Sequence, residues 1–157
     1  GSEMCIRDSL NSCQNNHLFV GEEEKGIWRM ELSSGEKFLF DDIDLGNLSA
    51  DVEGLDIYES EDRRVLLASS QGDDTFVAYD IETGKVLSKF HVGESLDGKT
   101  DEVTHTDGIS ILSKAVRNFP EGLLVVQDDD NVDQDRQQMN QNFKVVDWRS
   151  VARLIQN

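Results

Sequence analysis

Residues 51–90, DVEGLDIYESEDRRVLLASSQGDDTFVAYDIETGKVLSKF, contain four short runs rich in Val, Ile, Leu and aromatic residues. Turn-forming pairs such as Thr83-Gly84 separate the runs, a pattern typical of consecutive β-strands joined by tight turns. We therefore predict four strands, a to d, over residues 53–58, 65–70, 75–80 and 85–91.

The same unit recurs on both sides of this stretch at a spacing of about 50 residues. The aligned segments are 18–22 with 67–71, 27–31 with 76–80, 53–57 with 107–111, 67–71 with 124–128, and 76–80 with 143–147. They add predicted strands at 18–21, 26–31, 36–40, 107–112, 122–127 and 142–147, with helix-like spacing of apolar residues only near 148–156. All-β repeats of this length with four strands are typical of β-propeller blades. The sequence thus predicts an all-β fold, a propeller fragment of about three four-stranded blades.

The beginning of the chain departs from this pattern. Residues 1–15 show no periodic apolar pattern, and Gly1-Ser2 resembles a cloning remnant, so we interpret 1–15 as a non-native or disordered leader. Cys5 and Cys13 have no metal-binding spacing; we expect inert thiols, with a disulfide as the alternative. Apolar residues then begin at Leu18, so the first unit is predicted to lack strand a. We expect residues 16–157 to be the C-terminal part of a larger propeller.

The amino-acid composition limits the classes of partner that the protein can bind. The chain has 157 residues, 32 acidic against 15 basic, and a net charge of −17. Its longest apolar runs, 65–68 and 123–126, are far shorter than the roughly 20 residues that span a bilayer, which argues against a membrane protein. Excess carboxylate also repels nucleic-acid phosphate. The partners to expect are cations, cationic proteins, or anions approached through a bound metal.

Oxygen-bearing side chains recur where strand a begins and strand b ends. These two positions lie at the same end of a blade, because the strands are antiparallel. The residues are Asp51, Glu53 and Asp107 at the starts of strand a, and Glu22, Gln71 and Asp128 at the ends of strand b. Oxygen donors of this kind suit a hard cation, calcium before magnesium or manganese. The alternative is chance, since a fifth of the chain is acidic and runs such as 59–62 are typical of solvated surface.

Six segments, in this order and spacing, resemble the β-propeller phytases, which are calcium-dependent enzymes that remove phosphate from inositol hexakisphosphate (phytate). The segments are LFVGEEEKGIW (18–28), DVEGLDIY (51–58), LLASSQG (66–72), THTDGISIL (104–112), FPEGLLVVQD (119–128) and NQNFKVVDW (140–148). The resemblance implies a six-bladed disc, monomeric as the complete protein, and a secreted or periplasmic location.

The resemblance also implies roles for single residues. Glu22, Asp51 and Glu53 would be catalytic through the calcium ions that they hold, Gln71 would support this cluster, and Asp107 would be a calcium ligand nearby. Asp128 and His105 are possible further contacts to metal or substrate.

Calcium would bridge the acidic protein and phytate, and activate water for attack on phosphorus. The basic residues that grip phosphate in the family lie upstream of this sequence, so we expect these 157 residues to be inactive alone. A non-enzymatic, calcium-stabilised propeller that serves as a binding scaffold is the alternative.

Overall fold

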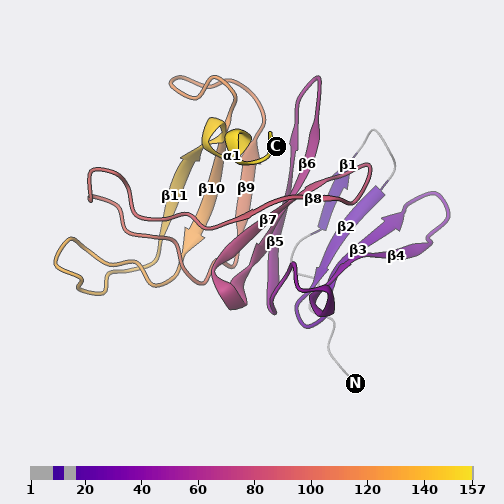
Figure 1. Ribbon diagram of the computed structural model, residues 1–157, viewed down its shortest axis with the longest axis horizontal. Helices are drawn as coiled ribbons and strands as arrows, with labels where there is room; N and C mark the ends of the chain where they lie inside the picture. The colour runs from indigo at the N-terminus through magenta and orange to yellow at the C-terminus, as the bar shows by residue number, and fades with distance from the viewer. Residues whose placement is uncertain (1–8, 13–16, 157) are drawn as a thin grey trace.

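The computed structural model describes residues 9–12 and 17–156, and its strands form three antiparallel sheets that lie side by side (Figure 1). The first sheet has the order β1-β2-β3-β4, the second β5-β6-β7-β8 and the third β11-β10-β9. The strands of the first sheet are β1 (Ser9–Ser12), β2 (His17–Glu22), β3 (Gly26–Glu31) and β4 (Lys37–Asp42). Those of the second are β5 (Val52–Glu59), β6 (Arg64–Ser70), β7 (Thr75–Asp80) and β8 (Val86–Phe90). Those of the third are β9 (Ile109–Leu112), β10 (Leu123–Asp128) and β11 (Asn142–Asp147).

Three short helices accompany the sheets: η1 (Ile43–Leu45), η2 (Gln71–Asp73) and α1 (Trp148–Leu154). The ten predicted strands all form, with ends within two residues of the prediction, and α1 lies where the helix was expected. None of the helices in the described part of the chain is long and apolar enough to cross a membrane.

One prediction about strand number is wrong, namely that the first unit lacks strand a. β1 pairs with β2, from Ser9 opposite Val20 to Ser12 opposite His17, so the first sheet has the strand that we expected it to lack. Strand pairing uses backbone groups, and a segment without an apolar pattern can therefore add to a sheet. The third sheet has three strands, because the chain enters α1 directly after β11. β1 lies within the stretch that we set aside as a leader, whereas Cys5 and Cys13 lie outside the described residues.

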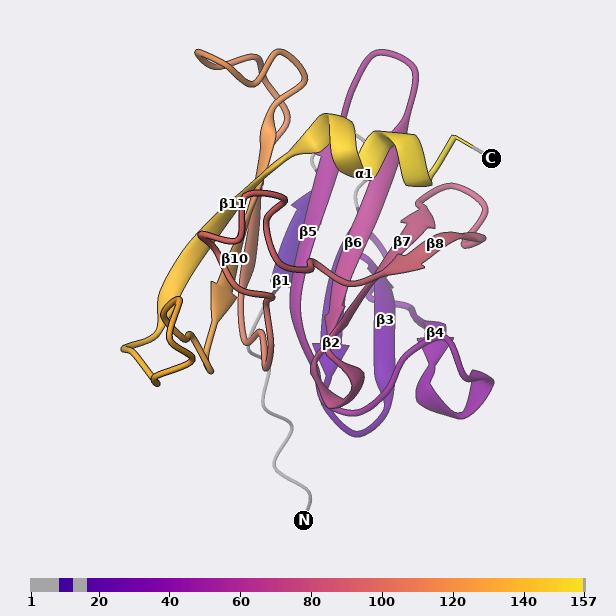
Figure 2. The ribbon, with the colours of Figure 1, turned by 60° about the vertical axis from the view of Figure 1, so that its left-hand side comes forward.

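Apolar side chains fill the spaces between neighbouring sheets. Successive side chains of a strand point to opposite faces, and β6 buries both of its faces. Leu66 belongs to the core between the first and second sheets, and Leu67 to the core between the second and third. α1 covers the second core at one end of the sheets (Figure 2), where the Trp148 ring stacks on Tyr58 at a centroid distance of 4.0 Å.

One expected packing residue is exposed. Phe143 aligns with Phe76 in the repeat, which predicts that both rings pack between blades. Phe76 is buried, but Phe143 is 73% exposed, because it lies on β11 at the edge of the third sheet, where no described sheet covers it.

Candidate functional site

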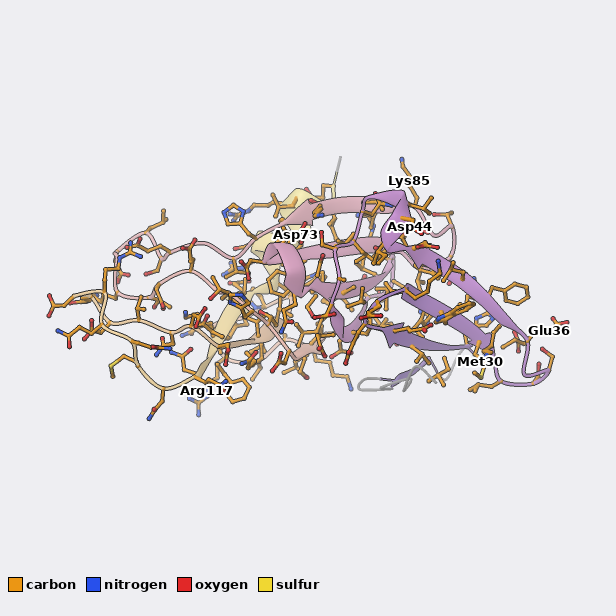
Figure 3. The ribbon with its side chains drawn as sticks, turned by 90° about the horizontal axis from the view of Figure 1, so that it is seen from below. Met30, Glu36, Asp44, Asp73, Lys85 and Arg117 are labelled. Atoms are coloured by element: carbon orange, nitrogen blue, oxygen red, sulfur yellow. The ribbon has the colours of Figure 1, made fainter. Side chains whose placement is uncertain are left out.

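The site residues predicted from the sequence gather along one edge of the three sheets. β2 and β6 end at this edge, while β5 begins there and the segment before β9 ends there; it is the lower edge in Figure 1, opposite α1. We call it the acidic edge and define it by Glu22, Asp51, Glu53, Gln71 and Asp107. Figure 3 looks onto it from below, with Asp44 of η1 and Asp73 of η2 over the first and second sheets.

Two glycines let the sheets approach closely at the acidic edge. A Cβ on Gly21 of β2 would lie 3.1 Å from the carbonyl oxygen of Val52, at the start of β5. A Cβ on Gly54 of β5 would lie 2.8 Å from the backbone nitrogen of Ile109 in β9. A side chain at Gly54 would force the backbone to shift, and one at Gly21 would require the neighbouring backbone to give by a few tenths of an ångström. The first sheet therefore approaches the second, and the second approaches the third, close to their acidic residues.

Hydrogen bonds bring Asp51, Gln71 and Asp107 together. The backbone N–H of Gln71 donates to the carbonyl of Asp51 at 2.9 Å. The Gln71 side-chain amide donates to Asp107 Oδ1 at 2.6 Å, and the Gln127 side-chain oxygen accepts from the backbone N–H of Asp107 at 2.8 Å. The second and third sheets are thus joined through polar groups of the acidic edge itself.

Glu22 and Glu53 have different surroundings. Glu22 accepts a hydrogen bond from the indole of the half-buried Trp28 at 2.7 Å. Glu53 is only 6% exposed. A carboxylate so removed from water is costly unless compensating groups or a cation are near it.

The donor chemistry of the acidic edge fits calcium. Four carboxylates and one carboxamide supply oxygen, and no sulfur ligand is among the five residues. Within the described residues, however, no three Asp, Glu, His or Cys side chains are close enough to form a metal site by themselves. The structure thus brings the elements together without showing a coordination sphere.

Asp128, one of the two possible further contacts, is engaged inside the protein. It is fully buried; its Oδ1 accepts from the Thr104 N–H at 3.0 Å and its Oδ2 lies 2.5 Å from Lys144 Nζ. Both carboxylate oxygens therefore bind groups of the chain.

His105, the other possible contact, is exposed. Its Nδ1 lies 3.0 Å from Asp130, and its backbone N–H donates to Asp74 Oδ1 at 2.7 Å. His105 and Asp74 both have positive φ, 46° and 54°. The pair thus fixes the turn after η2 against the loop that leads to Asp107.

Sequence reasoning missed two carboxylates near these contacts. Burial alone would raise the pKa of Asp73, but hydrogen bonds from Lys89, Thr75 and Ser70 hold it at about 2. Asp56 of β5 accepts from the Ile111 N–H in β9 at 2.5 Å, and burial raises its pKa. The repeat offered a signal for Asp56, because it aligns with Ser110, and Ser110 bonds to it across the two sheets.

Comparison with known proteins agrees with the resemblance seen in the sequence. The family model described as Phytase matches residues 10–157. The chain belongs to the phytase family. A curated relative in this family, the 3-phytase of Bacillus subtilis (strain 168), is 36% identical over 144 residues, which cover 87% of the chain and 36% of the relative. This phytase-family chain thus spans about a third of that relative's length.

Proposed function

We propose that the chain is the C-terminal part of a calcium-dependent phytase of the 3-phytase type, folded as a six-bladed β-propeller when complete. The proposal rests on family membership and on the place of its residues in the three sheets. The whole protein would act on phytate as a monomer outside the cytoplasm, and the 157 residues alone would be inactive.

The observation that carries the proposal is the convergence of oxygen donors from three sheets at the acidic edge. Gly21 and Gly54 let the sheets approach there, and Gln71 bonds to Asp107 across the second and third. Glu53 is nearly buried at this junction, where a bound cation would offset the cost of removing its charge from water.

Glu22, Asp51 and Glu53 would hold calcium, with Gln71 supporting the cluster and Asp107 binding a further ion nearby. Calcium would offset the repulsion between the −17 chain and the phosphates, and would lower the pKa of bound water for attack on phosphorus. The residues of this chain would orient the ions, while basic residues elsewhere in the whole protein would grip the phosphates.

The test is phosphate release from phytate by the whole protein that contains this chain. We expect activity with calcium and none with chelator. Asp51→Ala and Glu53→Ala should each lower turnover by at least about hundredfold, because metal ions contribute several kcal/mol to such transition states. Glu61→Ala, in the exposed turn between β5 and β6, is the matched control and should change little.

Near-normal turnover by Glu53→Ala at saturating calcium would refute the assignment. A whole protein that binds calcium at the acidic edge but releases no phosphate would instead support the scaffold alternative.

A further inference from the structure

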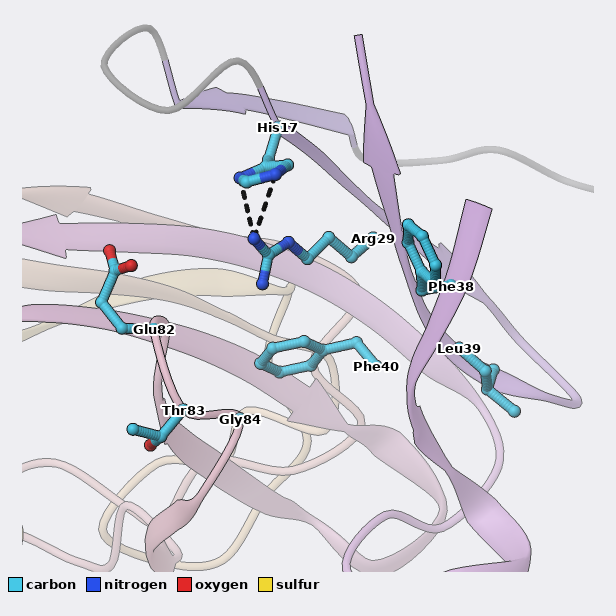
Figure 4. Close-up of a pocket in the computed structure, with 8 residues that line it drawn as sticks. All are labelled: His17, Arg29, Phe38, Leu39, Phe40, Glu82, Thr83 and Gly84. Carbon is cyan, nitrogen blue, oxygen red and sulfur yellow. Dashed lines mark hydrogen bonds between the residues drawn. The ribbon is translucent and has the colours of Figure 1, made fainter. Parts of the chain in front are cut away.

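A cavity of about 410 Å³ lies away from the acidic edge, between the first sheet and the turn that joins β7 to β8. Its lining residues are His17, Arg29, Phe38, Leu39, Phe40, Glu82, Thr83 and Gly84 (Figure 4). His17 begins β2, whereas Glu22 ends it, so the cavity lies toward the opposite edge of the sheets. Both walls belong to this chain, and its size is within the roughly 300–1,000 Å³ of small-molecule sites.

Arg29 is the cationic group of this cavity. Its guanidinium extends into the space between His17 and Phe40 (Figure 4). Nη2 lies 3.1 Å from His17 Nδ1 and 3.0 Å from Nε2, and the Nε and Nη1 donors have no acceptor among the described residues. Several other cations of the described residues instead pair with carboxylates, for example Lys89 with Asp73 at 2.7 Å and Arg149 with Asp147 at 2.5 Å.

The two carboxylates near Arg29, Glu31 and Glu82, are bound to other groups of the chain. Glu31 Oε2 lies 2.8 Å from His17 Nε2, so Nε2–H donates to this carboxylate and Nδ1 is left as the acceptor for Arg29 Nη2. Glu82, at the rim of the cavity, pairs with Arg64 Nη1 at 3.0 Å, which offsets its repulsion of an approaching anion.

Apolar side chains supply the rest of the wall. Phe38 and Leu39 are exposed, and Phe40 packs edge-on against Phe19 at a centroid distance of 5.2 Å. A Cβ on Gly84 would touch the Phe40 ring at 3.6 Å, so the turn lies close over this ring. A guanidinium beside aromatic rings matches a ligand with a charged head and an apolar body.

We propose that this cavity binds a small organic anion, an oxyanion headgroup attached to an apolar or aromatic body, with Arg29 donating to the headgroup and Phe38 and Phe40 contacting the body. The site is separate from the acidic edge and does not depend on the proposed function. Carboxylates and phosphate monoesters share the chemistry that Arg29 recognises, and the experiment distinguishes them.

The experiment is a titration of the 157-residue chain, followed by calorimetry and by ¹H–¹⁵N NMR. The probes are phenyl phosphate and benzoate, with inorganic phosphate and phenol as the head alone and the body alone. We expect saturable binding of phenyl phosphate, benzoate or both, at least about tenfold tighter than either half-probe, and shifts of the Arg29 Nε–H and Gly84 signals. Whichever probe binds more tightly identifies the headgroup.

Arg29→Gln should weaken binding by at least about tenfold, the effect of losing a charge-assisted hydrogen bond. Arg153→Gln, on the exposed side of α1, is the matched control and should bind as the unchanged chain does. Should Arg29→Gln fail to fold, the NMR shifts of the unchanged chain decide alone. The proposal is overturned by absence of binding up to about 10 mM, by equal binding of the half-probes, or by shifts confined to other residues such as Gly54 and Gly108.

Discussion

Gly54→Ala tests the close approach of the second and third sheets most directly. The added Cβ would lie 2.8 Å from Ile109 N and 3.2 Å from the Cα of Gly108, well inside the roughly 3.5 Å of normal contact. The obstacle is backbone, which cannot rotate away as a side chain could. The strands must therefore move apart, and such overpacking costs about 1–3 kcal/mol.

Gly108→Ala is the matched control from the equivalent repeat position. Its Cβ would meet no heavy atom within 4 Å, and neither glycine has a positive φ that disfavours alanine. Gly108→Ala should leave stability unchanged or raise it by up to about 1 kcal/mol, because alanine restricts the unfolded chain.

Thermal unfolding, monitored by circular dichroism, measures the difference in stability between the two variants. For a chain of this size the midpoint should fall by about 2–12 °C in Gly54→Ala, and should stay the same or rise in Gly108→Ala. Equal midpoints for the two variants would refute the reasoning that the close approach of the two sheets requires glycine at position 54.

Three further predictions concern calcium, a buried carboxylate and acid. Millimolar calcium should raise the unfolding midpoint above that measured in chelator, by the equivalent of about 2.7 kcal/mol at a hundredfold excess over Kd. Asp51→Asn should reduce this rise and Glu61→Gln should not. Equal rises in the two variants would place the ion elsewhere. Tyr79→Phe removes the donor that lies 2.6 Å from Oδ2 of buried Asp41, and should lower the free energy of unfolding by about 1–3 kcal/mol in urea titration; an unchanged midpoint would contradict this. The pKa of Asp73 is lowered from 3.8 to about 2, so its contribution to stability is complete above 3.8 and is lost as the pH falls through about 2. Asp73→Asn should therefore flatten the pH dependence of stability in this window, and an unaltered slope there would show that other groups cause it.

Most strands could be predicted because each is a short apolar run between turn residues, and the run recurs in the repeat. β6 is the clearest example, since Leu66 and Leu67 face different cores and a continuous apolar run is required. β1, with the sequence SLNS, has no such pattern and is specified by its pairing with β2. That information lies in the partner strand, so local sequence does not reveal it.

The edge on which the candidate residues lie could also be predicted, because antiparallel pairing fixes which strand ends meet. The contacts among those residues could not. Nothing in local sequence shows that the Gln71 amide bonds to Asp107, 36 positions away, or that Trp28 donates to Glu22. The first contact depends on the approach of the second and third sheets, which Gly54 allows, and the second on the register of β2 against β3.

Asp128 shows that an equivalent position in the repeat predicts where a residue lies but not what its side chain binds. It aligns with Gln71 at the end of the second strand of its sheet, and this equivalence led us to expect an exposed donor. The strand beside it decides otherwise: Val77 of β7 aligns with Lys144 of β11, and the lysine pairs with Asp128 while an apolar side chain could not.

The contacts of Lys144 also fix the segment that leads to the acidic edge. The same ammonium lies 2.5 Å from Asp101 Oδ1 and donates to the Glu102 carbonyl at 3.0 Å, while Asp128 accepts from the Thr104 N–H. Removing one member of so buried a pair leaves an uncompensated charge, at a cost of about 3–5 kcal/mol. The segment that these contacts hold leads directly into Asp107. Asp128 therefore serves the acidic edge by fixing the loop that presents another carboxylate, and its own charge is neutralised in doing so.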